Sequence, residues 1–225
     1  MKTVYIAGDS TAAHKLDEKR PETGWGEKIP LFFDDTVHFE NRAVNGRSTK
    51  SYLAEGRLDE IKKTIQKDDY LFIQFGHNDQ KIEDPERGTA PFADYLTNLD
   101  LFVNVATEVG ARPVLLTPIS RRNYLEDGSL NSECLGQYPA AVRQFAAEKQ
   151  LPLLDLFTAS QTWLSQFKPE KTRQFFLQGK PGELPNYPDG VMDNTHLNEK
   201  GATEIARLVA QAIEKSELDL KNALL

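Results

Sequence analysis

The feature that most constrains the fold is the alternation of short apolar runs with amphipathic helical patterns along the whole chain. The run Tyr70–Phe75 is almost continuously apolar, as is typical of a strand buried on both faces of a parallel sheet. Further strands are predicted at Thr3–Ala7, Val37–Asn41, Pro113–Thr117 and Leu151–Leu156. Strands that alternate with helices favour right-handed βαβ units. We therefore predict a single α/β domain over residues 1–225, a three-layer α/β/α sandwich around a five-stranded parallel sheet.

Apolar residues that recur every three or four positions predict the helices between these strands. The predicted helices are at 28–33, 51–65, 92–106, 138–149, 158–167 and 202–213, and one more opens at Ser10. The segment Lys168–Val191 is rich in proline, glycine and charge, so a long surface loop is predicted there. The C-terminal tail, 217–225, is expected to pack on its own domain or on a neighbouring subunit.

Composition excludes several classes of protein. A net charge of -7 argues against a nucleic-acid-binding protein, which normally carries a basic face. No apolar run approaches the ~20 residues of a membrane helix, and the N-terminus lacks the pattern of a signal peptide. Cys134 is the only cysteine, so no intrachain disulfide forms. We expect a cytoplasmic protein without nucleic-acid or membrane partners, although a trimmed N-terminus would give the same pattern.

Chemically useful side chains cluster where predicted strands end. Three segments each follow a strand, and a fourth lies in the predicted loop before the last helix: Gly8-Asp9-Ser10, Asn45-Gly46, Gly76-His77-Asn78-Asp79, and Asp193 with His196. Loops at the carboxyl ends of parallel strands share one edge of the sheet. A serine, a histidine, a carboxylate and polar donors at one edge are the groups that a serine hydrolase requires.

Each segment taken alone has a plainer interpretation. Asp9 or Ser10 caps a helix in many proteins, and Asn78-Asp79 is also a common turn signal. Asp193 and His196 are possible metal ligands, but no third strong ligand stands at a suitable spacing. No metal and no cofactor are therefore expected.

Taken in order, the segments resemble the four sequence blocks of the SGNH (GDSL-like) hydrolases. The blocks are Gly-Asp-Ser-Thr from residue 8, Asn-Gly-Arg-Ser from 45, Gly-His-Asn-Asp from 76 and Asp-x-x-His from 193. Within that superfamily the chain looks most like the rhamnogalacturonan acetylesterases. The resemblance implies a flavodoxin-like fold and a serine carboxylic ester hydrolase that needs no cofactor.

The resemblance also implies a role for each residue. Ser10 would attack the acyl carbonyl, His196 would act as general base, and Asp193 would orient the imidazole. The backbone N–H groups of Ser10 and Gly46 and the side-chain amide of Asn78 would form the oxyanion hole. Gly46, having no Cβ, would let the main chain approach closely.

The implied substrate is an acetylated rhamnogalacturonan oligosaccharide or polysaccharide, deacetylated through a Ser-His-Asp acyl-enzyme mechanism. This polymer is acidic, so local cations would have to offset the negative net charge. Arg121 and Arg122, which follow the fourth strand, are candidates for substrate contact or for solvated surface residues. His77 is a candidate substrate contact or a structural histidine.

The alternative functions are another acyl ester hydrolase, such as an acetylxylan esterase, lipase or thioesterase, or a non-catalytic carbohydrate-binding relative. The sequence leaves the oligomeric state open.

Overall fold

A five-stranded parallel sheet forms the centre of the computed structural model, which describes residues 2–225. The strands are β1 (Lys2–Gly8), β2 (Val37–Asn41), β3 (Tyr70–Gln74), β4 (Arg112–Leu116) and β5 (Leu153–Leu154). Their spatial order, β2-β1-β3-β4-β5, is that of flavodoxin-like folds. The predicted fold class is confirmed.

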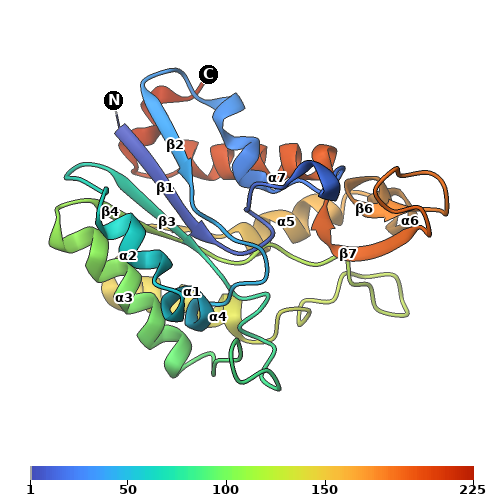
Figure 1. Ribbon diagram of the computed structural model, residues 1–225, viewed down its shortest axis with the longest axis horizontal. Helices are drawn as coiled ribbons and strands as arrows, with labels where there is room; N and C mark the ends of the chain where they lie inside the picture. The colour runs from blue at the N-terminus through green and yellow to red at the C-terminus, as the bar shows by residue number, and fades with distance from the viewer. Residues whose placement is uncertain (1) are drawn as a thin grey trace.

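Helices cover both faces of the sheet (Figure 1). One face carries α1 (Thr49–Ala54), α2 (Arg57–Lys62), α3 (Asp94–Glu108) and α4 (Tyr138–Lys149). The other carries α5 (Leu156–Leu164), α7 (Glu199–Glu214) and the 3-10 segments η2 (Trp25–Glu27), η3 (Ile29–Phe32) and η5 (Asp219–Ala223). No helix within residues 2–225 combines the length and apolar character needed to cross a bilayer.

The central strand explains why two helical layers are required. In β3, Tyr70 and Phe72 pack into the core beside α5 and α7, whereas Leu71 and Ile73 pack into the core beside α1–α4. Successive side chains of a strand point to opposite faces, so an unbroken apolar run must be covered on both sides.

The helix predicted at 51–65 is in fact two helices. Gly56 lies between α1 and α2 with φ +68, a left-handed conformation that interrupts the helical backbone. Leu58 and Ile61 are buried as the pattern predicts, but Ala54 is exposed and Tyr52 occupies the core instead. A residue-by-residue helical pattern does not reveal this break.

The helix predicted to open at Ser10 does not form. The N–H groups of Ala12 and Ala13 both reach the carbonyl of Asp9, which closes one turn. The next carbonyl, of Ser10, accepts Lys15 Nζ, and those of Thr11 and Ala12 accept the N–H groups of Trp25 and Gly26. These carbonyls are therefore not available to continue a helix. The segment predicted as a helix at 28–33 is likewise a short 3-10 turn, η3.

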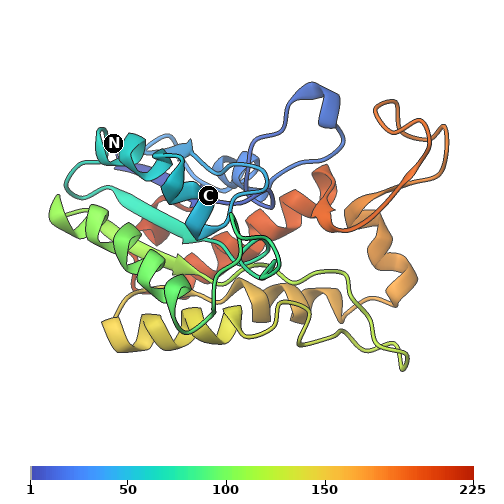
Figure 2. The ribbon, with the colours of Figure 1, turned by 60° about the horizontal axis from the view of Figure 1, so that its bottom comes forward.

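The long loop predicted at Lys168–Val191 contains regular structure. It holds α6 (Pro169–Thr172), η4 (Arg173–Phe175) and β6 (Phe176–Gly179), and β6 pairs with β7 (Val191–Leu197) in an antiparallel ribbon. The run Phe175 to Leu177 is buried, which draws the segment against the core. Asp193 and His196 consequently lie on a strand, and their predicted loop position is wrong. Figure 2 shows this ribbon at the end of the molecule where the longest loops project.

The C-terminal tail packs on its own chain. Leu218, Leu220 and Ala223 are buried in the core beside α7, and Leu225 N–H donates to the carbonyl of Phe32. Of the two arrangements expected for this tail, the structure has the intramolecular one.

Candidate active site

Ser10 lies two residues beyond the carboxyl end of β1, in the turn closed by Asp9. Its Oγ is 2.8 Å from Nε2 of His196, which arrives from β7, 186 residues later in the chain. Strand β7 is held at this place in part by the Thr23 N–H, which donates to the Leu197 carbonyl. The serine and the histidine thus meet only through tertiary structure.

Asp193 holds the other side of the imidazole. Its Oδ2 is 2.6 Å from Nδ1 of His196, and its Oδ1 accepts the backbone N–H groups of Thr195 and His196. Burial on its own would raise the pKa of Asp193, but the hydrogen bonds from His196 and Thr195 outweigh it and lower the pKa to about 2. An ionised carboxylate here favours the tautomer with its proton on Nδ1, which leaves Nε2 to accept the proton of Ser10.

Three hydrogen-bond donors stand in the loops that follow β1, β2 and β3. Within residues 2–225 the backbone N–H groups of Ser10 and Gly46 donate no hydrogen bond. Asn78 donates one N–H of its amide to the Arg47 carbonyl at 3.0 Å and accepts Lys81 Nζ on Oδ1 at 3.0 Å, which leaves its second N–H available. Donors of this kind stabilise a negatively charged oxygen.

Gly46 adopts a backbone conformation that favours glycine. Its φ is +75, in the left-handed region, and an added Cβ would meet no protein atom within 4 Å. The glycine therefore serves the turn itself, and the predicted close approach of its main chain to the oxyanion stays a prediction.

The comparisons with known proteins agree with this geometry. Residues 6–203 match the GDSL-like Lipase/Acylhydrolase family. The chain belongs to that family. It is 42% identical to rhamnogalacturonan acetylesterase RhgT of Bacillus subtilis strain 168, over 98% of this chain and 93% of that protein. It is 36% identical to the probable rhamnogalacturonan acetylesterase YesY of the same strain, over 99% of this chain and 97% of that protein.

Solved structures show where this GDSL-like hydrolase sits among known folds. The crystal structure of YxiM from Bacillus subtilis is similar with a TM-score of 0.81 and 25% identity, covering 97% of this chain and 57% of that one. The acetylxylan esterase Axe2 of Geobacillus stearothermophilus is similar with a TM-score of 0.64 and 17% identity, covering 94% of each chain. At 17% identity, the similarity to Axe2 concerns the fold alone.

Asp79 joins two loops of this GDSL-like hydrolase. Its Oδ1 accepts the backbone N–H of Thr49 at 3.0 Å, the Thr49 hydroxyl at 2.6 Å and the Thr89 hydroxyl at 3.1 Å. It thereby fixes the start of α1, just after Gly46, to the loop that carries Asn78. Burial raises the pKa of Asp79 to about 7, despite these hydrogen bonds.

His77 forms a buried pair with Asp9. The His77 side chain is 3% exposed, and its Nδ1 is 3.2 Å from Oδ2 of Asp9. Burial favours the neutral acid, but His77 and the two hydrogen bonds from Thr11 hold the pKa of Asp9 below its usual value. Of the two interpretations of His77, this position favours the structural one.

Arg121 and Arg122 both hold strand β7. The Arg121 guanidinium donates to the Thr195 hydroxyl and to the His77 carbonyl, so it bridges β7 and the third loop. Arg122 Nη1 donates to Oδ1 of Asn194 at 3.0 Å, and its other nitrogens bond residues of α6. Both arginines are half-buried. Their predicted contact with substrate stays a prediction.

Sequence reasoning missed two charged residues beside the nucleophile. The Lys15 side chain has no exposed surface, and its Nζ lies 2.8 Å from Oε1 of Glu22. The same Glu22 oxygen is 4.0 Å from Nε2 of His196. Because a lysine normally faces solvent, no local signal reveals this pair.

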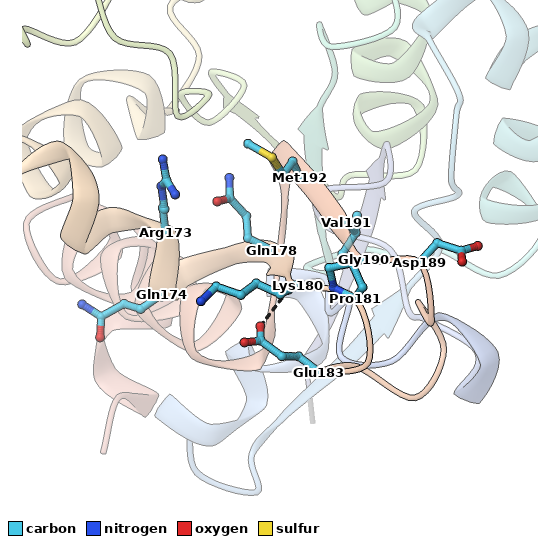
Figure 3. Close-up of a pocket in the computed structure, with 11 residues that line it drawn as sticks. Arg173, Gln174, Gln178, Lys180, Pro181, Glu183, Asp189, Gly190, Val191 and Met192 are labelled. Carbon is cyan, nitrogen blue, oxygen red and sulfur yellow. Dashed lines mark hydrogen bonds between the residues drawn. The ribbon is translucent and has the colours of Figure 1, made fainter.

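A cavity of about 580 Å³ lies on the β6–β7 ribbon (Figure 3). Figure 3 shows the side chains of Arg173, Gln178 and Met192 pointing the same way from it, with Lys180 close by. Gln178 Nε2 donates to Oδ1 of Asn194 at 2.6 Å, which connects the cavity to the strand that carries Asp193. Residues 2–225 contain no cluster of three side chains suited to hold a metal ion.

Proposed function

We propose that this GDSL-like hydrolase removes acetyl groups from rhamnogalacturonan oligosaccharides through an acetyl-Ser10 intermediate. The hydrogen-bonded chain from Ser10 Oγ through His196 to Asp193 carries this proposal, with distances of 2.8 and 2.6 Å. Hydrogen-bonded contact between nucleophile, base and orienting carboxylate is what a serine esterase requires before its substrate arrives.

In the first half of the reaction, Ser10 Oγ forms a bond to the acetyl carbon while its proton passes to Nε2 of His196. The carbonyl oxygen becomes an oxyanion, which accepts the N–H groups of Ser10, Gly46 and Asn78. The bond to the sugar oxygen then breaks, and His196 returns the proton to that oxygen. In the second half, water repeats these steps on the acetyl-enzyme and releases acetate and free Ser10.

The substrate class rests on the relatives. Two proteins 42% and 36% identical over nearly the whole chain are named as a rhamnogalacturonan acetylesterase and a probable one. An acetylxylan esterase shares only the fold, at 17% identity, so xylan is the second candidate. A non-catalytic carbohydrate-binding role would not require Ser10 Oγ to face an imidazole whose tautomer is set by Asp193.

The cavity on the β6–β7 ribbon offers the local cations that an acidic polymer needs. Lys180 and Arg173 line it together with two carboxylates, Glu183 and Asp189. The Lys180 ammonium lies within 4.0 Å of no carboxylate in residues 2–225, whereas Arg173 pairs with Glu170 at 3.2 Å. The amide of Gln178 adds a polar group of the kind that fixes a sugar. We assign this cavity to a uronate residue of the substrate, beside the contacts predicted for Arg121 and Arg122.

Acetate release tests the reaction and the substrate together. Acetylated rhamnogalacturonan oligosaccharides, acetylated xylan and an aryl acetate are compared, with Ser10→Ala as the blank. Ser10-dependent release from the first substrate at the highest kcat/KM is expected. Cleavage of xylan alone, or of the aryl acetate alone, would refute the substrate, and full activity of Ser10→Ala would refute the mechanism.

The uronate assignment has its own test. Lys180→Ala is expected to raise KM for the acidic oligosaccharide several-fold at low ionic strength and to leave kcat/KM for the aryl acetate unchanged. Lys171→Ala, which changes a cation outside the cavity lining, is the matched control. Equal KM values for Lys180→Ala and Lys171→Ala would exclude the cavity as the uronate site.

We also propose that the protein works in the cytoplasm on imported oligosaccharides. The single cysteine, Cys134, is buried and free, which suits a reducing compartment. Recovery of the native full-length protein from the culture medium would refute this.

A further inference from the structure

A buried lysine lies directly behind the nucleophile. Lys15 Nζ donates to the Ser10 carbonyl at 2.5 Å, to Oδ1 of Asn45 at 2.6 Å and to Oε1 of Glu22 at 2.8 Å. These three acceptors use all three donors of the ammonium group. Burying a charged pair costs desolvation energy that its mutual attraction only partly returns. The pair therefore contributes little net stability, and its position next to Ser10 suggests a different role.

Two of the three contacts join the loops that carry the free backbone donors. One contact is to the carbonyl of Ser10, whose own N–H donates no hydrogen bond within residues 2–225. Another is to Asn45, the residue directly before Gly46, the second backbone donor. Arg47 Nη1 also donates to the Asn45 carbonyl, at 2.8 Å. Lys15 thus adds a side-chain connection between the loop after β1 and the loop after β2, beside the Val44 N–H that donates to the Gly8 carbonyl at 3.0 Å.

The third contact concerns the histidine. Glu22 Oε1 is 4.0 Å from Nε2 of His196, the nitrogen that faces Ser10, while Asp193 occupies the Nδ1 side. The imidazole therefore has a carboxylate near each nitrogen. A carboxylate on the Nε2 side stabilises the imidazolium before any substrate arrives, which would remove the base. The ammonium of Lys15, 2.8 Å from the same oxygen, cancels much of that effect.

We propose that Lys15 is a positioning residue that sets the spacing of the two backbone oxyanion donors and offsets the negative charge of Glu22 beside Nε2 of His196. The inference rests on the proposed roles of Ser10 and His196. The other charged or titratable groups around the histidine are Asp193, the Asp9–His77 pair and Arg121, which bonds Thr195. They stay unchanged in the variants below, so a shift reports on the Lys15–Glu22 pair.

The test compares Lys15→Met, Glu22→Gln and the double variant by kcat/KM on an aryl acetate between pH 4.5 and 9. Glu22→Gln should move the acid limb of the profile to lower pH, because the imidazolium loses a nearby negative charge. Lys15→Met should move it to higher pH and also lower kcat about 10- to 100-fold, because the two oxyanion loops lose the side-chain bridge between Ser10 and Asn45. The double variant should return the acid limb toward that of the wild type while kcat stays low.

The controls separate this inference from the proposed function. Lys28→Met with Glu199→Gln removes an exposed pair of similar length, 2.6 Å, and should leave the profile unchanged. Acid limbs that coincide in the wild type, Glu22→Gln and the double variant would overturn the electrostatic role, even if Lys15→Met alone does not fold. Normal kcat in the double variant would overturn the positioning role. If a serine-directed phosphonate fails to label Ser10 in the wild type, the proposed function itself is wrong.

Discussion

Replacing Asp79 by asparagine should flatten the pH dependence of the free energy of unfolding. Burial raises the pKa of Asp79 from 3.8 to about 7, and the opposing hydrogen bonds from Thr49 and Thr89 do not compensate. In the unfolded chain this carboxyl group is hydrated and titrates at its ordinary pKa. The folded protein therefore binds one more proton than the unfolded chain between about pH 4 and pH 7. The contribution of Asp79 to the free energy of unfolding is greatest below that window and falls as pH rises through it.

The expected size follows from the two pKa values. Since a tenfold change in proton affinity is worth about 1.4 kcal/mol, a rise from 3.8 to about 7 corresponds to about 4 kcal/mol. The Asp79→Asn variant keeps an acceptor at Oδ1 for Thr49 and Thr89 but carries no ionisable group. Between pH 4 and pH 8 the wild type should therefore lose about 4 kcal/mol more stability than the variant.

Urea unfolding at several pH values measures this difference. The comparison uses the wild type and Asp79→Asn, so that all other titrating groups cancel. Asp155→Asn serves as a control whose effect on the pH dependence has the opposite sign. Burial favours the neutral form of Asp155, but Arg143, Thr158 and Thr117 outweigh it and lower its pKa, so its contribution to stability is lost as pH falls. Parallel profiles for the wild type and Asp79→Asn would refute the reasoning, because they would mean that Asp79 has the same proton affinity in both states.

Three further outcomes are expected. Asn78→Ala should lower kcat on an aryl acetate ~10²- to 10³-fold with an unchanged circular dichroism spectrum, because it removes one of three oxyanion donors; a loss below threefold would contradict this. Asp193→Asn should lower kcat ~10⁴-fold at pH 8, because the wrong tautomer of His196 is favoured; since the pKa of Asp193 is about 2, this carboxylate stays ionised at pH 4 and an acid limb of the wild-type profile there does not belong to it. Leu220→Ala should reduce stability by about 2–5 kcal/mol in urea unfolding, because the side chain is buried in the core; an unaffected midpoint would place the tail outside it.

The layers and the sheet could be predicted from the sequence because their signals are local. The apolar run that became β3 and the amphipathic pattern that became α7 each need only neighbouring residues to be recognised. The order of the four blocks could also be recognised from the sequence, since each block follows a predicted strand or precedes the last helix. Parallel topology then requires the first three to share one edge of the sheet.

Errors arose where a distant segment competes for backbone hydrogen bonds. Nothing near Ser10 indicates that the carbonyls of Thr11 and Ala12 accept N–H groups from residues 25 and 26, yet those bonds prevent the helix. The ribbon formed by β6 and β7 was read as loop because proline, glycine and charge dominate its flanks, whereas the burial of Phe175 to Leu177 decides its conformation.

The sequence by itself determined which groups are available for catalysis, and the tertiary structure alone decided which charges surround them. Ser10, Asn78, Asp193 and His196 stand in recognisable blocks. Lys15 and Glu22 stand in none, because a buried lysine is defined by its partners and not by its neighbours in the chain. Asn45 and Glu22 reach Lys15 only when the loops after β1 and β2 close over it, and the resulting field at His196 exists only in the folded protein.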